Sequence, residues 1–136
     1  MNQQKGMTLV EILIAVGVIG ILSAIAYPSY QQQTLKGYRS QAMADLMKIQ
    51  LRLEEQYTQH GDYKFDLTVS AGTCSFCETE PSRYQFSIDD SGSTPAERYI
   101  LAAKPQKSSG QHKDACGVLY LNAIGMGSSE SDTNCW

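Results

Sequence analysis

Four cysteines are the residues of this chain best suited to chemistry: Cys74, Cys77, Cys116 and Cys135. The first two form a CxxC pair, a pattern that can bind zinc, exchange electrons or close a disulfide. A zinc ribbon needs a second CxxC, but Cys116 and Cys135 lie far apart in the sequence. The residues around the CxxC pair also lack the strand and helix of a thiol redox motif. We therefore expect two disulfides, for which the sequence alone permits three pairings.

The other titratable side chains predict no catalytic group. His60 and His112 have no nucleophile or metal ligand at a suitable spacing, and Asp89 and Asp90 are typical turn-forming acids. The oxygen-bearing side chains of residues 128–134 leave calcium open as an alternative. We expect a protein without enzymatic activity, without a bound metal and without a cofactor.

Three lysines, Lys104, Lys107 and Lys113, lie close together in sequence, in neighbouring loops that also hold His112. Lysines in such a group can neutralise DNA phosphates, but acids such as Asp114 dilute their charge. The whole chain has 11 Lys and Arg against 14 Asp and Glu, a net charge of -3. Nucleic acid is therefore not the default partner. We expect weak DNA affinity without strong sequence preference.

Glu11 is the only charged residue in an apolar run that extends from Met7 to Tyr27. As a helix, this run is about 31 Å long, which matches the hydrocarbon core of a bilayer. A carboxylate in such a helix is costly in lipid and marks a functional residue that needs a partner. We expect residues 7–27 to form a transmembrane and assembly helix, preceded by a leader at residues 1–6.

After the apolar run, the sequence predicts a second, amphipathic stretch of helix. Pro28 removes one backbone donor, so we expect it to kink the helix without ending it. Apolar residues then recur at spacings of three and four, up to a helix end near His60 and Gly61. The apolar stripe comprises Leu35, Tyr38, Ala42, Leu46, Ile49, Leu53 and Tyr57.

The remaining sequence predicts strands and loops. Alternating or apolar runs at residues 84–89, 99–103 and 117–122 favour three strands, while residues 61–81 and the Gly- and Ser-rich residues 125–136 favour loops. The expected fold class is α+β, in which a long N-terminal helix packs on an antiparallel sheet of three to four strands. Residues 28–136 are expected to form one domain outside the membrane.

The N-terminal junction resembles the class III signal of type IV pilins. Gly6 matches the cleavage glycine of that family, Met7 the new N-terminus, Glu11 the acid at the fifth mature position, and Pro28 the helix-kinking proline. A plain membrane anchor or an uncleaved signal peptide is the alternative, but neither needs these residues. The resemblance implies cleavage after Gly6, N-methylation of Met7, and pairing of Glu11 with the N-terminal amine of an adjacent subunit.

The C-terminal part is similar to small minor or accessory pilins, whose last region is bounded by a disulfide. Of the three pairings we expect Cys74–Cys77 and Cys116–Cys135, because the second would hold a tail that has few apolar residues of its own. This similarity covers residues 99–136 loosely.

The resemblance implies a minor type IV pilus subunit that supports motility, adhesion or DNA uptake. It implies an inner-membrane protein with a periplasmic C-terminal domain, which moves to a cell-surface pilus on assembly. Its expected partners are other pilins, the prepilin peptidase and methyltransferase, and the inner-membrane assembly platform. A DNA-binding competence pilin and a type II secretion pseudopilin are the two alternatives.

Overall fold

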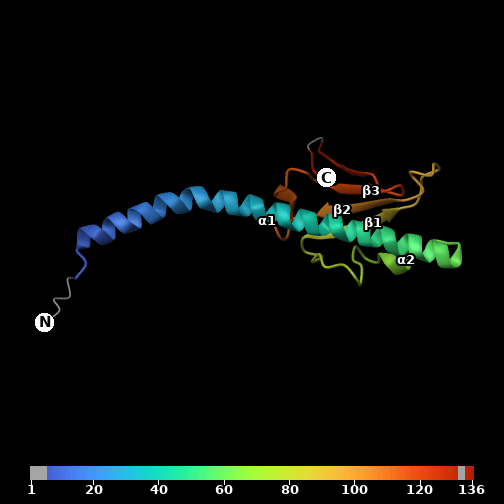
Figure 1. The fold of residues 1–136 in the computed structure, drawn as a ribbon, viewed down its shortest axis with the longest axis horizontal. Coiled ribbons are helices and arrows are strands. Elements are labelled where there is room, and N and C mark those ends of the chain that lie inside the picture. Colours follow the sequence, from blue (N-terminus) through green and yellow to red (C-terminus); the bar gives the residue numbers. More distant parts are fainter. Residues whose placement is uncertain (1–5, 132–133) are drawn as a thin grey trace. The chain divides into compact units, whose positions relative to one another are not determined.

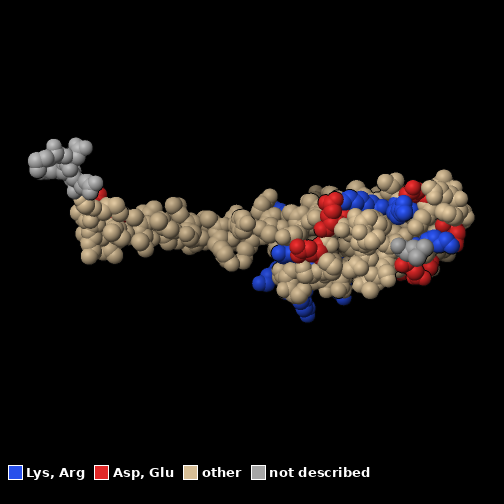
Figure 2. All heavy atoms as spheres, turned by 90° about the horizontal axis from the view of Figure 1, so that it is seen from below, with Lys and Arg blue, Asp and Glu red and all other residues tan. Residues whose placement is uncertain are grey.

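A computed structural model describes residues 6–131 and 134–136 of the chain and divides it into two compact units that meet between Thr34 and Leu35. The first unit is helical. Helix α1 (Leu9–His60) starts in this unit and continues through Pro28, so that the proline stands inside the helix. Its apolar side chains are exposed on every side, and Figure 2 shows this helix as an almost unbroken uncharged surface.

The second unit contains the rest of α1, where the middle of the predicted apolar stripe is buried, Leu35 and Tyr38 are half-buried, and Tyr57 is exposed. Ala42, Leu46, Ile49 and Leu53 are each at most 1% exposed. The helix ends where Gly61 adopts a left-handed backbone with φ of 74°, and the Gly61 N–H donates to the Tyr57 carbonyl at 2.7 Å. This is the predicted glycine cap.

Four strands form an antiparallel meander beside this part of α1 (Figure 1). They are β1 (Tyr84–Asp89), β2 (Ile100–Pro105), β3 (Leu119–Asn122) and β4 (Gly127–Ser129), in the order β1-β2-β3-β4. Alternate residues point to opposite faces of a sheet. One face therefore buries Tyr84, Phe86, Leu101, Ala103, Leu119 and Leu121 in the same core as the helix stripe. The predicted α+β fold is confirmed.

The fourth strand lies in a tail whose composition favoured a loop. The turn before it depends on Gly125, which has φ of 81°, and on the Met126 N–H, which donates to Asn122 Oδ1 at 2.8 Å. Once the chain has turned, the glycine and serines of β4 pair with β3 through their backbone. The strand forms because of this pairing, which composition does not reveal.

Short elements occupy the long connections. Between α1 and β1 lie α2 (Phe65–Thr68) and an isolated bridge between Ser70 and Thr73. Between β2 and β3 lies the 3-10 helix η1 (Gln111–Lys113). Strand β2 begins at Ile100, one residue later than expected. Tyr99 precedes the strand and is fully buried. Its ring packs edge-on against those of Tyr63 and Phe65.

Candidate functional site

The residues of the N-terminal junction lie at the start of α1. Gly6 and Met7 precede the helix and are exposed, while residues 1–5 of the expected leader lie outside the described residues. The backbone N–H and the hydroxyl of Thr8 both donate to Glu11 Oε2 at 3.1 Å, and the Glu11 N–H donates to the Thr8 hydroxyl at 3.3 Å. This reciprocal arrangement is a capping box. Glu11 therefore has a partner within its own chain.

The helix that follows this cap meets the length and composition of a membrane span. Side chains from Leu9 to Ile25 are exposed in the single chain, including Ile14, Leu22 and Ile25 at 61–70%. Such a surface needs lipid or other apolar helices around it. Glu11 is the one acid in that surface.

Each of the two disulfides ties a loop of the second unit. Cys74 is bonded to Cys77 and Cys116 to Cys135, the same pairings that the sequence analysis favoured. Cys116 is 3% exposed and its bridge spans a sequence separation of 19. The second bridge therefore fastens residues 134–136 to the core.

Asp45 holds the loop that contains the first disulfide. Its side chain is fully buried in the helix stripe, and Oδ2 accepts from the Glu78 N–H at 3.0 Å, the Thr79 N–H at 2.7 Å and the Thr79 hydroxyl at 2.6 Å. Lys48 lies 3.2 Å from Oδ1. Desolvation opposes its ionisation, but the bonds from Thr79 and Glu78 outweigh that cost and keep the pKa of Asp45 below its usual value.

A buried polar network anchors the loop between β2 and β3. Arg39 of α1 donates to Asp114 Oδ1 at 2.7 Å, and Gln111 donates to the Leu35 carbonyl at 3.0 Å and to the Tyr84 hydroxyl at 3.1 Å. Burial raises the pKa of Tyr84 to about 12, so its hydroxyl stays protonated at neutral pH. Through these bonds, α1 and β1 fix the position of the loop.

The three lysines of the sequence analysis gather at one end of the sheet. Lys107 and Lys113 lie in the loop between β2 and β3, whereas Lys104 lies in β2 and not in a loop as expected. All three side chains are exposed. In residues 6–131 and 134–136, no carboxylate lies within ion-pair distance of them. Arg83, immediately before β1, holds the loop by donating to the Ser109 carbonyl at 3.1 Å.

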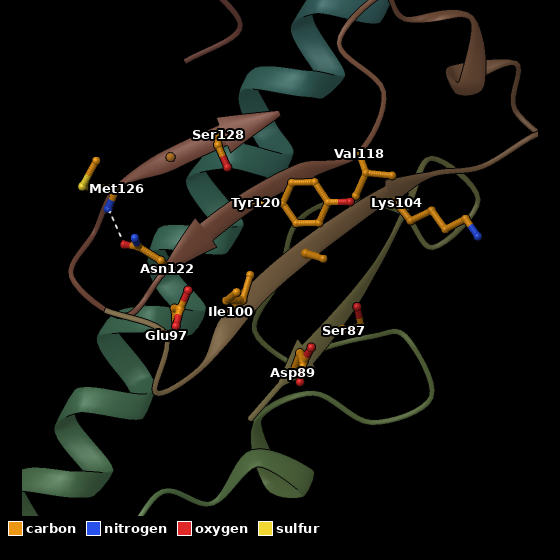
Figure 3. A pocket seen from close by; sticks show the side chains of 12 residues that line it. Ser87, Asp89, Glu97, Ile100, Lys104, Val118, Tyr120, Asn122, Met126 and Ser128 are labelled. Atoms are coloured by element: carbon orange, nitrogen blue, oxygen red, sulfur yellow. Dashed lines mark hydrogen bonds between the residues drawn. The ribbon is translucent and has the colours of Figure 1, made fainter. Parts of the chain in front are cut away.

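The outward face of the sheet is hollowed to a volume of about 740 Å³. Its middle row crosses all four strands, because Ser87 pairs with Ala102, Ala102 with Tyr120, and Tyr120 with Ser128. Three of these four side chains are small, so the Tyr120 ring lies across an open floor (Figure 3). Because β2 and β3 are central strands, the floor is built on the most firmly paired part of the sheet.

The two ends of the hollow have opposite charges. Lys104 lies at one end in Figure 3, and Asp89 and Glu97 lie away from it. Asp89 accepts from the Ser91 hydroxyl at 2.6 Å, a bond that lowers the pKa of this carboxyl. Glu97 Oε2 accepts from the Thr94 hydroxyl at 3.0 Å. Both acids are thus held in place by the turn between β1 and β2.

No metal-binding group is present among the described residues, since no three His, Cys, Asp or Glu side chains cluster there. The calcium alternative also involved residues 132 and 133, which lie outside the part of the chain that the structure describes. His60 and His112 are both exposed and far apart in the chain.

Sequence reasoning identified Glu11 but missed its cap with Thr8, and it missed Asp45 and Tyr120. Thr8 and Glu11 form the S/T-x-x-E signature of a capping box, which the sequence does display. No sequence pattern identified Asp45, because an acid within an apolar stripe only interrupts the pattern. Tyr120 belongs to a strand that was predicted, but the hollow around it depends on which residues face it from the neighbouring strands.

Two family models together match most of the chain. Residues 28–120 match the family described as type IV minor pilin ComP, DNA uptake sequence receptor. Residues 1–27 match the prokaryotic N-terminal methylation motif. The second match covers the junction of Gly6, Met7 and Glu11.

Individual relatives agree with the family models. The chain is 39% identical over 72 residues to the type IV major pilin protein PilE of Neisseria gonorrhoeae, covering 53% of this chain and 42% of that protein. It is 34% identical over 86 residues to a fimbrial protein of Neisseria meningitidis serogroup B, covering 63% and 49%. The chain thus spans less than half the length of these relatives. The solved structure of a type IV pilin from Shewanella oneidensis is similar with a TM-score of 0.51 and 27% identity, covering 75% of this chain and 97% of that one.

Proposed function

Because the chain belongs to the ComP family of type IV minor pilins, we propose that it is a minor pilin that binds DNA at the surface of a type IV pilus. The family description favours the competence alternative of the sequence analysis over a pilin without a nucleic-acid partner. The pseudopilin alternative has no observation in its favour. As a structural subunit, the chain is expected to act by assembly and binding and not by catalysis.

The proposal includes a route to the pilus. A prepilin peptidase cleaves between Gly6 and Met7, and Met7 is N-methylated. The helix over residues 7–27 holds the chain in the inner membrane, with residues 28–136 in the periplasm, until the assembly platform transfers it to the fibre. The exposed apolar helix and its match to the methylation motif support this route. Mass spectrometry of the chain from cells should find Met7 as a methylated N-terminus, and an intact leader would contradict the route.

The observation behind DNA binding is the group of unpaired cations at one end of the sheet. Lys104, Lys107 and Lys113 are exposed and have no carboxylate partner in the described parts of the chain. The Arg39–Asp114 pair and Gln111 hold the loop that presents two of them. Loop cations fixed in this way can contact phosphates without first becoming ordered.

A salt series tests the proposal. The full chain in detergent micelles is titrated with fluorescently labelled duplex DNA at several salt concentrations. Each phosphate contact contributes about one unit to the slope of log affinity against log salt. The double variant Lys107→Gln, Lys113→Gln should therefore reduce that slope by about two and weaken binding to every duplex.

A matched variant controls for net charge. Arg52→Gln, Lys64→Gln also removes two exposed cations, but these lie on α1 and just before α2, away from the lysine group. This variant should leave the salt slope unchanged. Equal effects of the two double variants would show that only the total charge matters, and undetectable DNA binding by the unaltered chain would contradict the proposed function.

A further inference from the structure

The hollow on the outward face of the sheet offers uncharged hydrogen-bonding groups beside the lysine group. In the described residues, the Tyr120 hydroxyl and Asn122 Nδ2 have no hydrogen-bond partner, although Asn122 Oδ1 accepts from the Met126 N–H. Both side chains line the hollow, and both come from β3 (Figure 3). One strand thus presents a free hydroxyl and a free amide N–H on the same face of the sheet, the hydroxyl toward the Lys104 end and the amide toward Met126.

The charge at each end of the hollow decides what it can accept. Lys104 stands next to the middle row and pairs across the sheet with Gln85, while Ile100 at the opposite end pairs with Asp89. A polyanion is attracted to the first end and repelled from the second, where Asp89 and Glu97 lie. The phosphates of an anionic ligand are therefore expected over the Lys104 end of the hollow and not over the end with Asp89 and Glu97.

We propose, on the basis of the DNA-binding function above, that this hollow contacts the base edges of a DNA duplex and makes the binding sequence-dependent. Tyr120 and Asn122 face the bases, Lys104 contacts the phosphate backbone at one end, and Asp89 and Glu97 exclude the backbone at the other. Uncharged donors and acceptors distinguish bases, whereas cations on phosphates do not. Repulsion by the two acids adds specificity by disfavouring duplexes that place phosphates over that end of the hollow.

This division of roles makes the hollow separable from the lysine group. The lysines should contribute equally to all duplexes and should set the salt slope. Tyr120 and Asn122 carry no charge, so they should affect only the preferred sequence and leave the salt slope unchanged. The two acids should have the opposite effect on DNA affinity. Removing them lowers the electrostatic repulsion between this face of the sheet and any duplex.

The experiment compares two duplexes on the full chain in detergent micelles. One is a short duplex that the unaltered chain enriches from a randomised library, and the other is a shuffled duplex of the same composition. Tyr120→Phe and Asn122→Ala should each weaken binding of the enriched duplex by about tenfold, as expected for one lost base contact. Binding of the shuffled duplex and both salt slopes should not change.

The variant that removes the two acids should change DNA affinity in the opposite direction. Asp89→Asn with Glu97→Gln should strengthen binding of the shuffled duplex several-fold, steepen its salt slope, and reduce the preference for the enriched one. Lys64→Gln, which removes an exposed charge outside the hollow, should not change the preference. Fluorescence of Trp136, which packs at β4, checks that each variant keeps its fold.

The outcomes distinguish this inference from the proposed function. If the lysine variant weakens binding but the Tyr120 and Asn122 variants affect both duplexes equally or neither, DNA binding stands and the role of the hollow is wrong. If the library yields no enriched duplex, sequence-dependent contact is likewise contradicted. If Tyr120→Phe leaves DNA binding intact but lowers incorporation of the chain into fibres, the hollow is occupied by another pilin subunit and the inference is overturned.

Discussion

The parts of α1 on either side of Thr34 have the same backbone structure but opposite surroundings. Before Thr34 the apolar side chains are exposed all round the helix and Glu11 is the one charged residue. After Thr34 one apolar stripe is buried against the sheet, while Met47 and Leu51 on the other side of the helix are exposed. The first part must find its apolar partners outside the chain, whereas the second part finds them within it. Substitutions in the first part should therefore affect insertion and assembly, and those in the second should affect folding.

Glu11 gives the largest expected effect on assembly. Glu11→Ala removes both the capping partner of Thr8 and the only acid of the exposed helix. We expect incorporation into fibres to fall by at least about tenfold, which corresponds to about 1.4 kcal/mol of lost assembly free energy. Immunoblots of sheared fibres measure it, with membrane fractions as the reference.

A second variant distinguishes the role of Glu11 in the helix cap from its expected role in assembly. Thr8→Val removes the hydroxyl of the capping box but keeps the carboxylate of Glu11. It should cost only about 1 kcal/mol of helix stability and leave most of the incorporation intact. If it abolishes incorporation as completely as Glu11→Ala does, the role of Glu11 is confined to the cap.

A pair of leucines tests the comparison directly. Leu46 is fully buried under the sheet, and Leu22 is 61% exposed in the single chain. Leu46→Ala should lower the free energy of unfolding of the second unit by about 2–5 kcal/mol, whereas Leu22→Ala should leave it unchanged. Urea unfolding in micelles, followed by Trp136 fluorescence, measures both. Equal effects of the two substitutions would contradict the division of α1 into two regions.

The Cys116–Cys135 bridge should contribute about 3 kcal/mol to the stability of the second unit in the loop-entropy model. The variant Cys116→Ala, Cys135→Ala should lose that amount in the same urea assay. Cys74→Ala, Cys77→Ala opens a much shorter loop and should lose less. Non-reducing peptide maps establish the pairing, and a crossed pattern would remove the basis of this prediction.

Among the changes within the second unit, Asp45→Asn gives the smallest expected loss of stability, together with a specific dependence on pH. The pKa of Asp45 is lowered in the folded chain, so its stabilising contribution is present above the ordinary pKa of about 3.9 and is lost as the pH falls through the folded value. Asp45→Asn should cost about 1–2 kcal/mol at pH 7, because charge-assisted bonds to Thr79 weaken. The difference in stability between the two proteins should begin to shrink only below about pH 4 and should vanish once the pH lies below the lowered pKa of Asp45 in the folded chain. A constant difference at all pH values would show that Asp45 is not the titrating group.

Local patterns predicted most of the fold. The apolar stripe and Gly61 predicted the course and end of α1, and the alternation around Phe86 predicted β1. These features could be identified because burial of one helix or strand face imposes its own period on the sequence. Strand β4 could not be identified in the same way, because its glycine and serines contribute backbone pairing and no apolar face.

The candidate site was less predictable than the fold. The three lysines were identified from their spacing, but the sequence did not show that Lys104 lies in a strand beside Tyr120. The hollow exists because Ser87, Ala102 and Ser128 are aligned across four strands. That alignment depends on strand register, which is set by turns and pairing between distant residues. Similarly, the stabilising contribution of Asp45 depends on hydrogen bonds from Thr79, a residue far away in the chain.

The way β4 is held has a consequence for the timing of folding. The indole of Trp136 donates to the Ser128 carbonyl at 2.6 Å, and a side chain on Gly127 would collide with its ring. Cys135 beside it is bonded to Cys116. Both fastening residues follow all four strands of the described sheet in the sequence. The edge strand is therefore expected to dock last, because its fastening by Trp136 and Cys135 cannot form until residues 134–136 have been synthesised.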